Sequence, residues 1–124
     1  MTTAFWCVLV AALLPFVATV IAKRSGERFN NRDPRAWLEK QQGLSRRANS
    51  AQANGFEAFP IFAAGVIIAH LAQAPQARID LLAIGFVIAR IAFLVCYLAD
   101  WHWARSLVWA VGLGLCVALF FAGA

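Results

Sequence analysis

The sequence predicts an all-α membrane protein, a bundle of four transmembrane helices, from its length, its composition and its apolar segments. The chain has 124 residues, of which 62% are hydrophobic. A helix needs about 20 apolar residues to cross a hydrocarbon core of about 30 Å. Four segments meet this requirement, at residues 4–22, 51–71, 79–99 and 104–122. Little chain remains for a second domain, so we expect one membrane domain over residues 1–124.

The first apolar segment is expected to be a helix of the mature protein rather than a secretory signal. No positive side chain precedes it in Met1-Thr2-Thr3, and a dense basic stretch follows it. Both features differ from those of a signal peptide, which begins with a positive region.

Most of the charge lies in the loop over residues 23–47. This loop has eight Lys or Arg and three Asp or Glu, so its net charge of 8 − 3 = +5 equals that of the chain. By the positive-inside rule we expect the loop in the cytoplasm and both termini on the opposite side. Attraction to anionic lipid explains such a patch beside a membrane better than nucleic-acid binding does.

Several local features predict turns, surface contacts and packing. Asp33-Pro34 indicates a turn, and residues 35–46 fit a short helix at the membrane surface with Trp37 and Leu38 at headgroup level. Pro60 is expected to kink the second segment. Trp101, Trp103 and Trp109 are expected in the belt of tryptophans at the membrane surface. Gly112 and Gly114 are small residues that allow close packing of the last helix. His70 has no evident partner, and the spacing of Cys7, Cys96 and Cys116 predicts no metal site.

Two ionisable side chains lie deep in the apolar segments, Glu57 in the second and Arg90 in the third. A charge in hydrocarbon costs about 2.5 kcal/mol or more, so such groups usually face the protein interior and mark function. Glu57 follows Arg47 by ten residues, and Arg90 precedes Asp100 by ten. At 1.5 Å per residue, both lie about 15 Å from the same membrane boundary. We therefore expect a salt bridge, or a bridge through one water, between them.

Further polar residues share faces with this pair. Asn54 lies three residues before Glu57, and Tyr97 lies seven after Arg90. One interpretation is a structural network in which the two charges neutralise each other and fix the register of the bundle. Another is a site for an anionic cytosolic ligand, since arginine binds carboxylates well. A proton or ion pathway is the third. The additional donors available to a ligand are Arg47, Asn54, Tyr97 and Arg105.

The sequence also resembles a known family. The second segment contains Ala51-Gln52-x-Asn54-x-x-Glu57-x-Phe59-Pro60-x-Phe62, and Ala89-Arg90, Tyr97 and Arg105-Ser106 follow. These motifs resemble the MAPEG family, the membrane-associated proteins in eicosanoid and glutathione metabolism, and in particular its short bacterial members. The resemblance covers nearly the whole chain. It implies a homotrimer in the lipid bilayer, here the bacterial inner membrane.

The resemblance further implies a glutathione-dependent transferase or peroxidase that acts on a lipophilic small molecule at the cytoplasmic face. Arg105 would then activate the thiol, with Tyr97 or Ser106 as a hydrogen-bond donor. Two positions differ from enzymatic members: leukotriene-synthase-like members have arginine in place of Ser50, and eukaryotic enzymes often have tyrosine or histidine in place of Phe93. The alternative is a non-catalytic membrane protein that binds a lipid or an anionic metabolite. The implied glutathione contacts are Arg47, Asn54, Glu57, Arg90 and Tyr97.

Overall fold

Each long apolar stretch forms one continuous helix in the computed structural model, which describes all 124 residues. The helices are α1 (Thr3–Ser25), α2 (Pro34–Glu39), α3 (Gly43–Leu71), α4 (Gln76–Leu98) and α5 (His102–Phe121). All except α2 are apolar and long enough to cross a membrane. The fold is therefore the all-helical membrane bundle that the sequence predicts.

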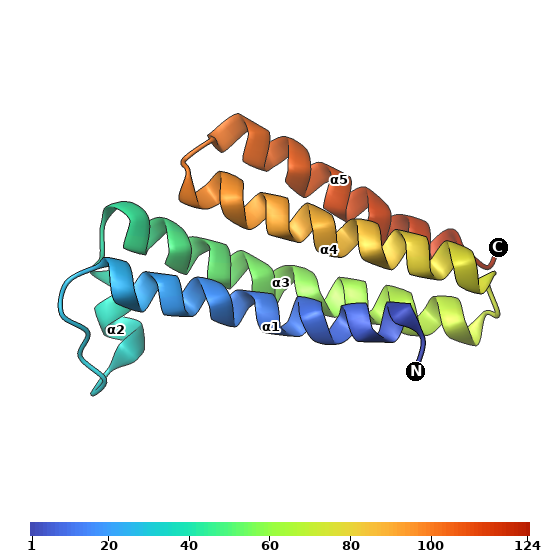
Figure 1. Ribbon diagram of the computed structural model, residues 1–124, viewed down its shortest axis with the longest axis horizontal. Coiled ribbons are helices and arrows are strands. Elements are labelled where there is room, and N and C mark those ends of the chain that lie inside the picture. The colour runs from blue at the N-terminus through green and yellow to red at the C-terminus, as the bar shows by residue number, and fades with distance from the viewer.

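The long helices form two antiparallel hairpins, α1 with α3 and α4 with α5 (Figure 1). α2 and the α4–α5 turn lie at one end of the bundle, which we call the basic end because it carries the basic loop. Both chain termini lie at the other end, called the far end. In Figure 1 the hairpins converge at the far end and diverge toward the basic end.

The α1 helix packs against the bundle through small side chains. Its buried residues recur every three or four positions, at Ala4, Cys7, Ala11, Pro15, Ala18 and Ala22. Small residues let helix backbones approach closely, which matters in lipid because the hydrophobic effect adds little between helices there. On α3, a Cβ added at Gly55 would lie 2.8 Å from Pro15 Cγ. Glycine is therefore needed where these two helices cross.

A second tight crossing joins α3 and α5 at Gly65, where an added Cβ would lie 3.1 Å from Leu119 Cβ. The glycines selected from the sequence are in looser surroundings within the chain. A Cβ at Gly112 would meet Ala89 Cβ at 3.8 Å, an ordinary contact, and one at Gly114 would meet nothing within 4 Å. The composition of a helix shows that small residues are present but not which of them faces a neighbour.

The basic loop is shorter than the expected range 23–47 because both flanking helices extend beyond their apolar segments. The Ser45 hydroxyl donates to the Ala22 carbonyl at 2.6 Å. Ala22, Leu38 and Ala48 form a small buried cluster. Packing thus stabilises helical turns that are too polar for a hydropathy profile to include them in a transmembrane helix. It also removes Leu38, which is 5% exposed, from the headgroup contact predicted for it.

The predicted surface helix over residues 35–46 is also shorter, since α2 ends at Glu39. It begins as its sequence suggests, because the Asp33 carboxylate accepts from the Ala36 N–H and Pro34 occupies the first turn. The chain then turns inward at Gln41, whose side chain is buried and accepts from the Glu27 N–H at 3.1 Å. This buried amide interrupts the helix before α3 starts.

The α3 and α4 helices end in the same way. Gln73 and Asp100, one residue beyond each C-cap, have positive φ values of 55° and 60°. The next N–H then bonds to the carbonyl five residues earlier, Ala74 to Ala69 at 3.1 Å and Trp101 to Cys96 at 2.9 Å. These are Schellman endings, which reverse the chain sharply. The second one brings the start of α5 back beside the last turns of α4.

At the far end, His70 has partners, although the sequence suggested none. Its Nε2 lies 3.0 Å from Thr2 Oγ1, and Phe5 stacks on its ring with 4.0 Å between centroids. Nearby, the Asp80 carboxylate accepts from the Ala4 N–H at 2.9 Å. These contacts attach the start of α1 to both α3 and α4, and so hold the two hairpins together at this end.

Candidate functional site

An open cleft separates α3 from α4 and α5 in the half of the bundle nearer the basic end. Its volume is about 650 Å³, within the range of roughly 300–1,000 Å³ usual for small-molecule sites. All three helices contribute polar side chains to it. These are Ser50, Asn54, Glu57, Tyr97, Arg105 and Ser106. The cleft therefore brings together most of the residues that the sequence predicts for the site.

Arg105 presents a positive charge to the cleft. Its guanidinium lies 4.2 Å from the centroid of the Tyr97 ring, a cation–π contact. The Tyr97 ring is supported by the edge of Phe93 at 5.5 Å between centroids. Ser106 Oγ donates to the His102 carbonyl of its own helix at 3.2 Å. No ion pair within 4.0 Å neutralises Arg105, so its charge is available to a ligand.

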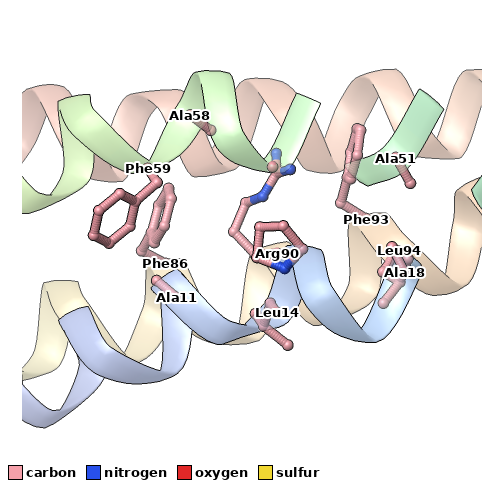
Figure 2. Close-up of a pocket in the computed structure, with 12 residues that line it drawn as sticks. Ala11, Leu14, Ala18, Ala51, Ala58, Phe59, Phe86, Arg90, Phe93 and Leu94 are labelled. Atoms are coloured by element: carbon pink, nitrogen blue, oxygen red, sulfur yellow. The ribbon is translucent and has the colours of Figure 1, made fainter. Parts of the chain in front are cut away.

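Arg90 lies deeper, half-buried between phenyl rings. Figure 2 shows its side chain between those of Phe86 and Phe93, with the guanidinium directed toward α3. The guanidinium lies 4.1 Å from the Phe93 ring centroid. Arg90 lines a cavity of about 20 Å³ on its α1 side, which is room for about one water molecule. It also lines a larger pocket of about 160 Å³ on the α5 side.

The predicted direct salt bridge between Glu57 and Arg90 is not formed. Both side chains line the 160 Å³ pocket, but no ion pair within 4.0 Å joins them. The reason is direction around the helix axis: Glu57 is on the exposed side of α3, whereas Arg90 is held between rings in the interior. The predicted similarity in depth is compatible with their shared pocket. Both charges are consequently without a partner in the chain.

Asn54 lies in the wall that the cleft and the 160 Å³ pocket share. Its Oδ1 is the one buried side-chain oxygen or nitrogen that has no hydrogen-bond partner. A buried polar atom without a partner is destabilising by about 1–3 kcal/mol, so native proteins rarely retain one without a reason. Asn54 Oδ1 therefore has an unused acceptor position within the chain.

Arg47 lies apart from the cleft. Its Nε and Nη2 donate to the Leu98 carbonyl at 3.3 and 3.2 Å. This carbonyl belongs to the last turn of α4, where backbone acceptors lack partners and positive charge is favourable. Arg47 therefore connects α3 to α4, and its predicted contact with a cofactor stays a prediction.

Two residues that the sequence analysis did not assign to the site also line these cavities. Trp109, interpreted from the sequence as part of a surface belt, lies in the walls of both the cleft and the 160 Å³ pocket. Cys116 lines that pocket and is 2% exposed. Their spacing from Arg105, four and eleven residues, places them on the same face of α5. The helical period thus places them on the Arg105 face, and the packing of α5 turns that face toward the site.

Together these features define a small four-span membrane protein with a polar cleft and an adjoining pocket, which hold Arg105, Arg90 and Glu57 without an ion pair among them. The model of the MAPEG family matches residues 3–124, essentially the whole chain, and the protein belongs to this family. It is accordingly an integral membrane protein. A comparison with curated proteins gave no match.

Proposed function

We propose that the protein is a glutathione-dependent transferase or peroxidase acting on lipophilic electrophiles. The observation that carries the proposal is a pair of arginines without counter-ions, Arg90 in the 160 Å³ pocket and Arg105 in the cleft, with Asn54, whose Oδ1 has no partner, lining both. Membership of the MAPEG family supports it, because members of this family use glutathione.

The chemistry of the cleft fits glutathione. This tripeptide carries two carboxylates, an ammonium group and a thiol, and is therefore an anion at neutral pH. The cleft and adjoining pocket offer two cations, Arg90 and Arg105, against one carboxylate, Glu57. A guanidinium can bind a carboxylate through two parallel hydrogen bonds. Glu57 suits the ammonium group, and the free Asn54 amide suits a peptide group.

We assign activation of the thiol to Arg105. A nearby positive charge lowers the pKa of a thiol, and the thiolate is the reactive nucleophile. The Tyr97 ring holds the Arg105 guanidinium, and Tyr97 and Ser106 place hydroxyl groups in the same cleft, that of Ser106 after it leaves the His102 carbonyl. In the transferase reaction, the sulfur of bound glutathione bonds to an electrophilic carbon while a proton and a leaving group depart. In the peroxidase reaction, two such thiols are oxidised to a disulfide while a hydroperoxide is reduced to an alcohol and water.

The surroundings of the cleft support a cytoplasmic site in a homotrimer. We place the basic end in the cytoplasm of a bacterial cell, since basic loops remain on that side of the inner membrane. Glutathione is water-soluble and its partner substrate is lipophilic, so an open cleft near the membrane surface lets the two meet. The trimer would cover the exposed carboxylate of Glu57, which lipid would not solvate.

The first experiment is calorimetric titration of glutathione into the detergent-purified protein, its Arg105→Ala variant and an Arg35→Ala control. Arg35 is exposed on α2, outside the cleft, so this control removes the same charge without changing the site. We expect saturable binding that weakens at least about tenfold, or 1.4 kcal/mol, in Arg105→Ala. The control should bind like the unmodified protein.

Ultraviolet absorbance of the thiolate provides a second measurement, because bound glutathione should ionise at lower pH with Arg105 present than without it. Absence of binding at millimolar glutathione would overturn the proposal. The alternative would then be favoured, a non-catalytic protein that binds a lipid or an anionic metabolite, and lipids that copurify with it would become the next subject.

A further inference from the structure

The positive charge at the basic end lies on one side of the bundle. The connection between α1 and α3, which contains α2, projects beside α1 on the side away from α4 and α5 (Figure 1). The α4–α5 turn at the same end contains Asp100 and has no Lys or Arg. A surface of exposed cations is therefore confined to α2 and the adjoining end of α1. We call it the basic edge, and its residues are Arg24, Arg28, Arg32, Arg35 and Lys40.

The cations of the basic edge are not neutralised within the chain. No ion pair within 4.0 Å joins any of them to a carboxylate, although Glu27, Asp33 and Glu39 belong to the same segment. Over residues 23–47 the positive side chains exceed the negative ones by five (8 − 3). The excess charge faces outward, where a ligand outside the chain can bind it.

Neutral groups hold the basic edge in its shape. Trp37 Nε1 donates to the Arg28 carbonyl at 3.0 Å, and the Trp37 ring packs edge-on against Phe29 with 5.1 Å between centroids. Gln41 Oε1 accepts from the Glu27 N–H at 3.1 Å, and Gln41 Nε2 donates to the Trp37 carbonyl at 3.0 Å. The fold of this segment therefore does not use the exposed cations. A surface that is already ordered also loses little entropy when it binds a ligand.

The basic edge lies at the level of the lipid phosphates. The α1 helix has 23 residues, or about 35 Å at 1.5 Å per residue, slightly more than a hydrocarbon core of about 30 Å. Its last turn, with Lys23 and Arg24, is therefore at the boundary of the core, and α2 follows at the same end. Phospholipids have their phosphate groups at this depth, and arginine binds phosphate through two parallel hydrogen bonds.

We propose that the basic edge is a binding site for the headgroup of an anionic phospholipid. A zwitterionic lipid fits less well, because its ammonium group would lie among the same cations. Lipid is also favoured over nucleic acid, because the basic edge is at the side of the bundle, where lipid headgroups are always in contact with it. The inference does not depend on the proposed function, since none of the five cations lines the cleft.

Lipid selectivity beside two tryptophans tests this assignment. One variant retains Trp37 as its only tryptophan, and a second retains only Trp6, which is 54% exposed near the start of α1 at the far end. Both are placed in phosphatidylcholine nanodiscs that contain a minor fraction of nitroxide-labelled phosphatidylglycerol or of nitroxide-labelled phosphatidylcholine, with the label near the headgroup end of the acyl chain. Because a nitroxide quenches tryptophan fluorescence at contact, the quenching shows which lipid lies beside each tryptophan.

We expect labelled phosphatidylglycerol to quench Trp37 as if it bound at least about fivefold more tightly than labelled phosphatidylcholine, since cations at the membrane surface attract anionic lipid. Trp6 should show no such preference, because Arg78 and Asp80 at its end of the bundle have opposite charges. Salt at about 1 M should reduce the preference at Trp37, since it screens charges beyond about 3 Å. Equal quenching of Trp37 by the two lipids, or the same preference at both tryptophans, would overturn the inference.

Two double variants with opposite changes of charge provide a matched control. Arg28→Gln with Arg35→Gln lowers the net charge to +3 (5 − 2), and Glu27→Gln with Glu39→Gln raises it to +7 (5 + 2). All four side chains are exposed and without an ion pair, so both variants should fold. The preference at Trp37 should fall at least about threefold in the first variant and rise in the second. An unchanged preference in both would overturn the assignment.

A short DNA duplex added to the same nanodiscs tests the other class of polyanion. At about 0.15 M salt, where the screening length is about 8 Å, the duplex should leave the quenching of Trp37 by phosphatidylglycerol unchanged. Displacement of the lipid by DNA would assign the basic edge to nucleic acid and overturn the inference. None of these measurements uses glutathione, so failure of the lipid site and failure of the proposed function are separate results.

Discussion

Three arginines near the cleft differ in what their surroundings allow them to do. Arg105 lies on an aromatic ring and faces open space, and Arg90 is half-buried between rings without a counter-ion. Arg47 instead donates two hydrogen bonds to a carbonyl at the end of α4. The first two are available to an anionic ligand, whereas the third has its hydrogen-bonding capacity largely committed to the fold.

Replacement of Arg47 should therefore affect stability more than binding. Arg47→Ala removes both bonds to the Leu98 carbonyl, and hydrogen bonds from charged groups contribute about 1.5–3 kcal/mol. We expect a loss of stability of that order in thermal unfolding in detergent, with glutathione affinity reduced less than about threefold. Arg46→Ala is the control, because the neighbouring Arg46 is exposed. Unchanged unfolding together with a large loss of affinity would assign Arg47 to the ligand instead.

At the scale of the helices, the sequence predicts how many transmembrane helices there are, their order and their approximate extent. It can do so because each helix that crosses the lipid needs a minimum length of apolar sequence. It does not predict the helix ends. The first turns of α3 are polar, yet they are helical because Ser45 bonds to Ala22 and Ala48 packs beside it. Such turns depend on contacts between segments that are distant in sequence, which a hydropathy profile cannot contain.

The candidate site likewise has features that the sequence predicts and features that it does not. Counting residues along a helix gives depth, and depth correctly groups Glu57 with Arg90 in one pocket. Direction around the axis depends on how each helix packs, and for this reason the direct salt bridge between Glu57 and Arg90 is not formed, whereas a bridge through one water stays a prediction. Residues spaced by three or four, such as Arg105 and Trp109, share a face of their helix, but the spacing does not show what that face contacts.

The buried stripe of small residues on α1 leads to a prediction at this scale. Ala18 is 1% exposed and its neighbour Val17 is 49% exposed. Ala18→Leu forces extra methylenes into the α1–α3 contact and should lower stability by about 1–3 kcal/mol. Val17→Leu adds a methylene on the outer face and should change stability by about 0.5 kcal/mol or less. Unfolding midpoints in detergent measure both, and similar midpoints would contradict this packing of α1.

For the whole molecule, the position of Glu57 is the main constraint. Glu57 lies fourteen residues from each end of α3 (57 − 43 and 71 − 57), the longest helix of the bundle. At 1.5 Å per residue, the carboxylate is about 21 Å from either end. It is nevertheless exposed, and the large apolar side chains Phe56 and Ile61 beside it are 43% and 45% exposed. A single chain in lipid would therefore place a carboxylate against hydrocarbon, whereas a homotrimer can enclose it.

The sign of the effect of Glu57→Leu distinguishes these two situations. If Glu57 faced lipid, leucine would remove a cost of about 2.5 kcal/mol or more, and the variant would be more stable. In a trimer that surrounds Glu57 with polar groups, the same change leaves those groups without a partner and should weaken assembly by about 1–3 kcal/mol. We expect the second result: native mass spectrometry should detect trimers of the unmodified protein, and the variant should dissociate at lower temperature. A monomeric protein that leucine stabilises would exclude the trimer and leave Glu57 as a lipid-facing carboxylate that only a bound ligand could neutralise.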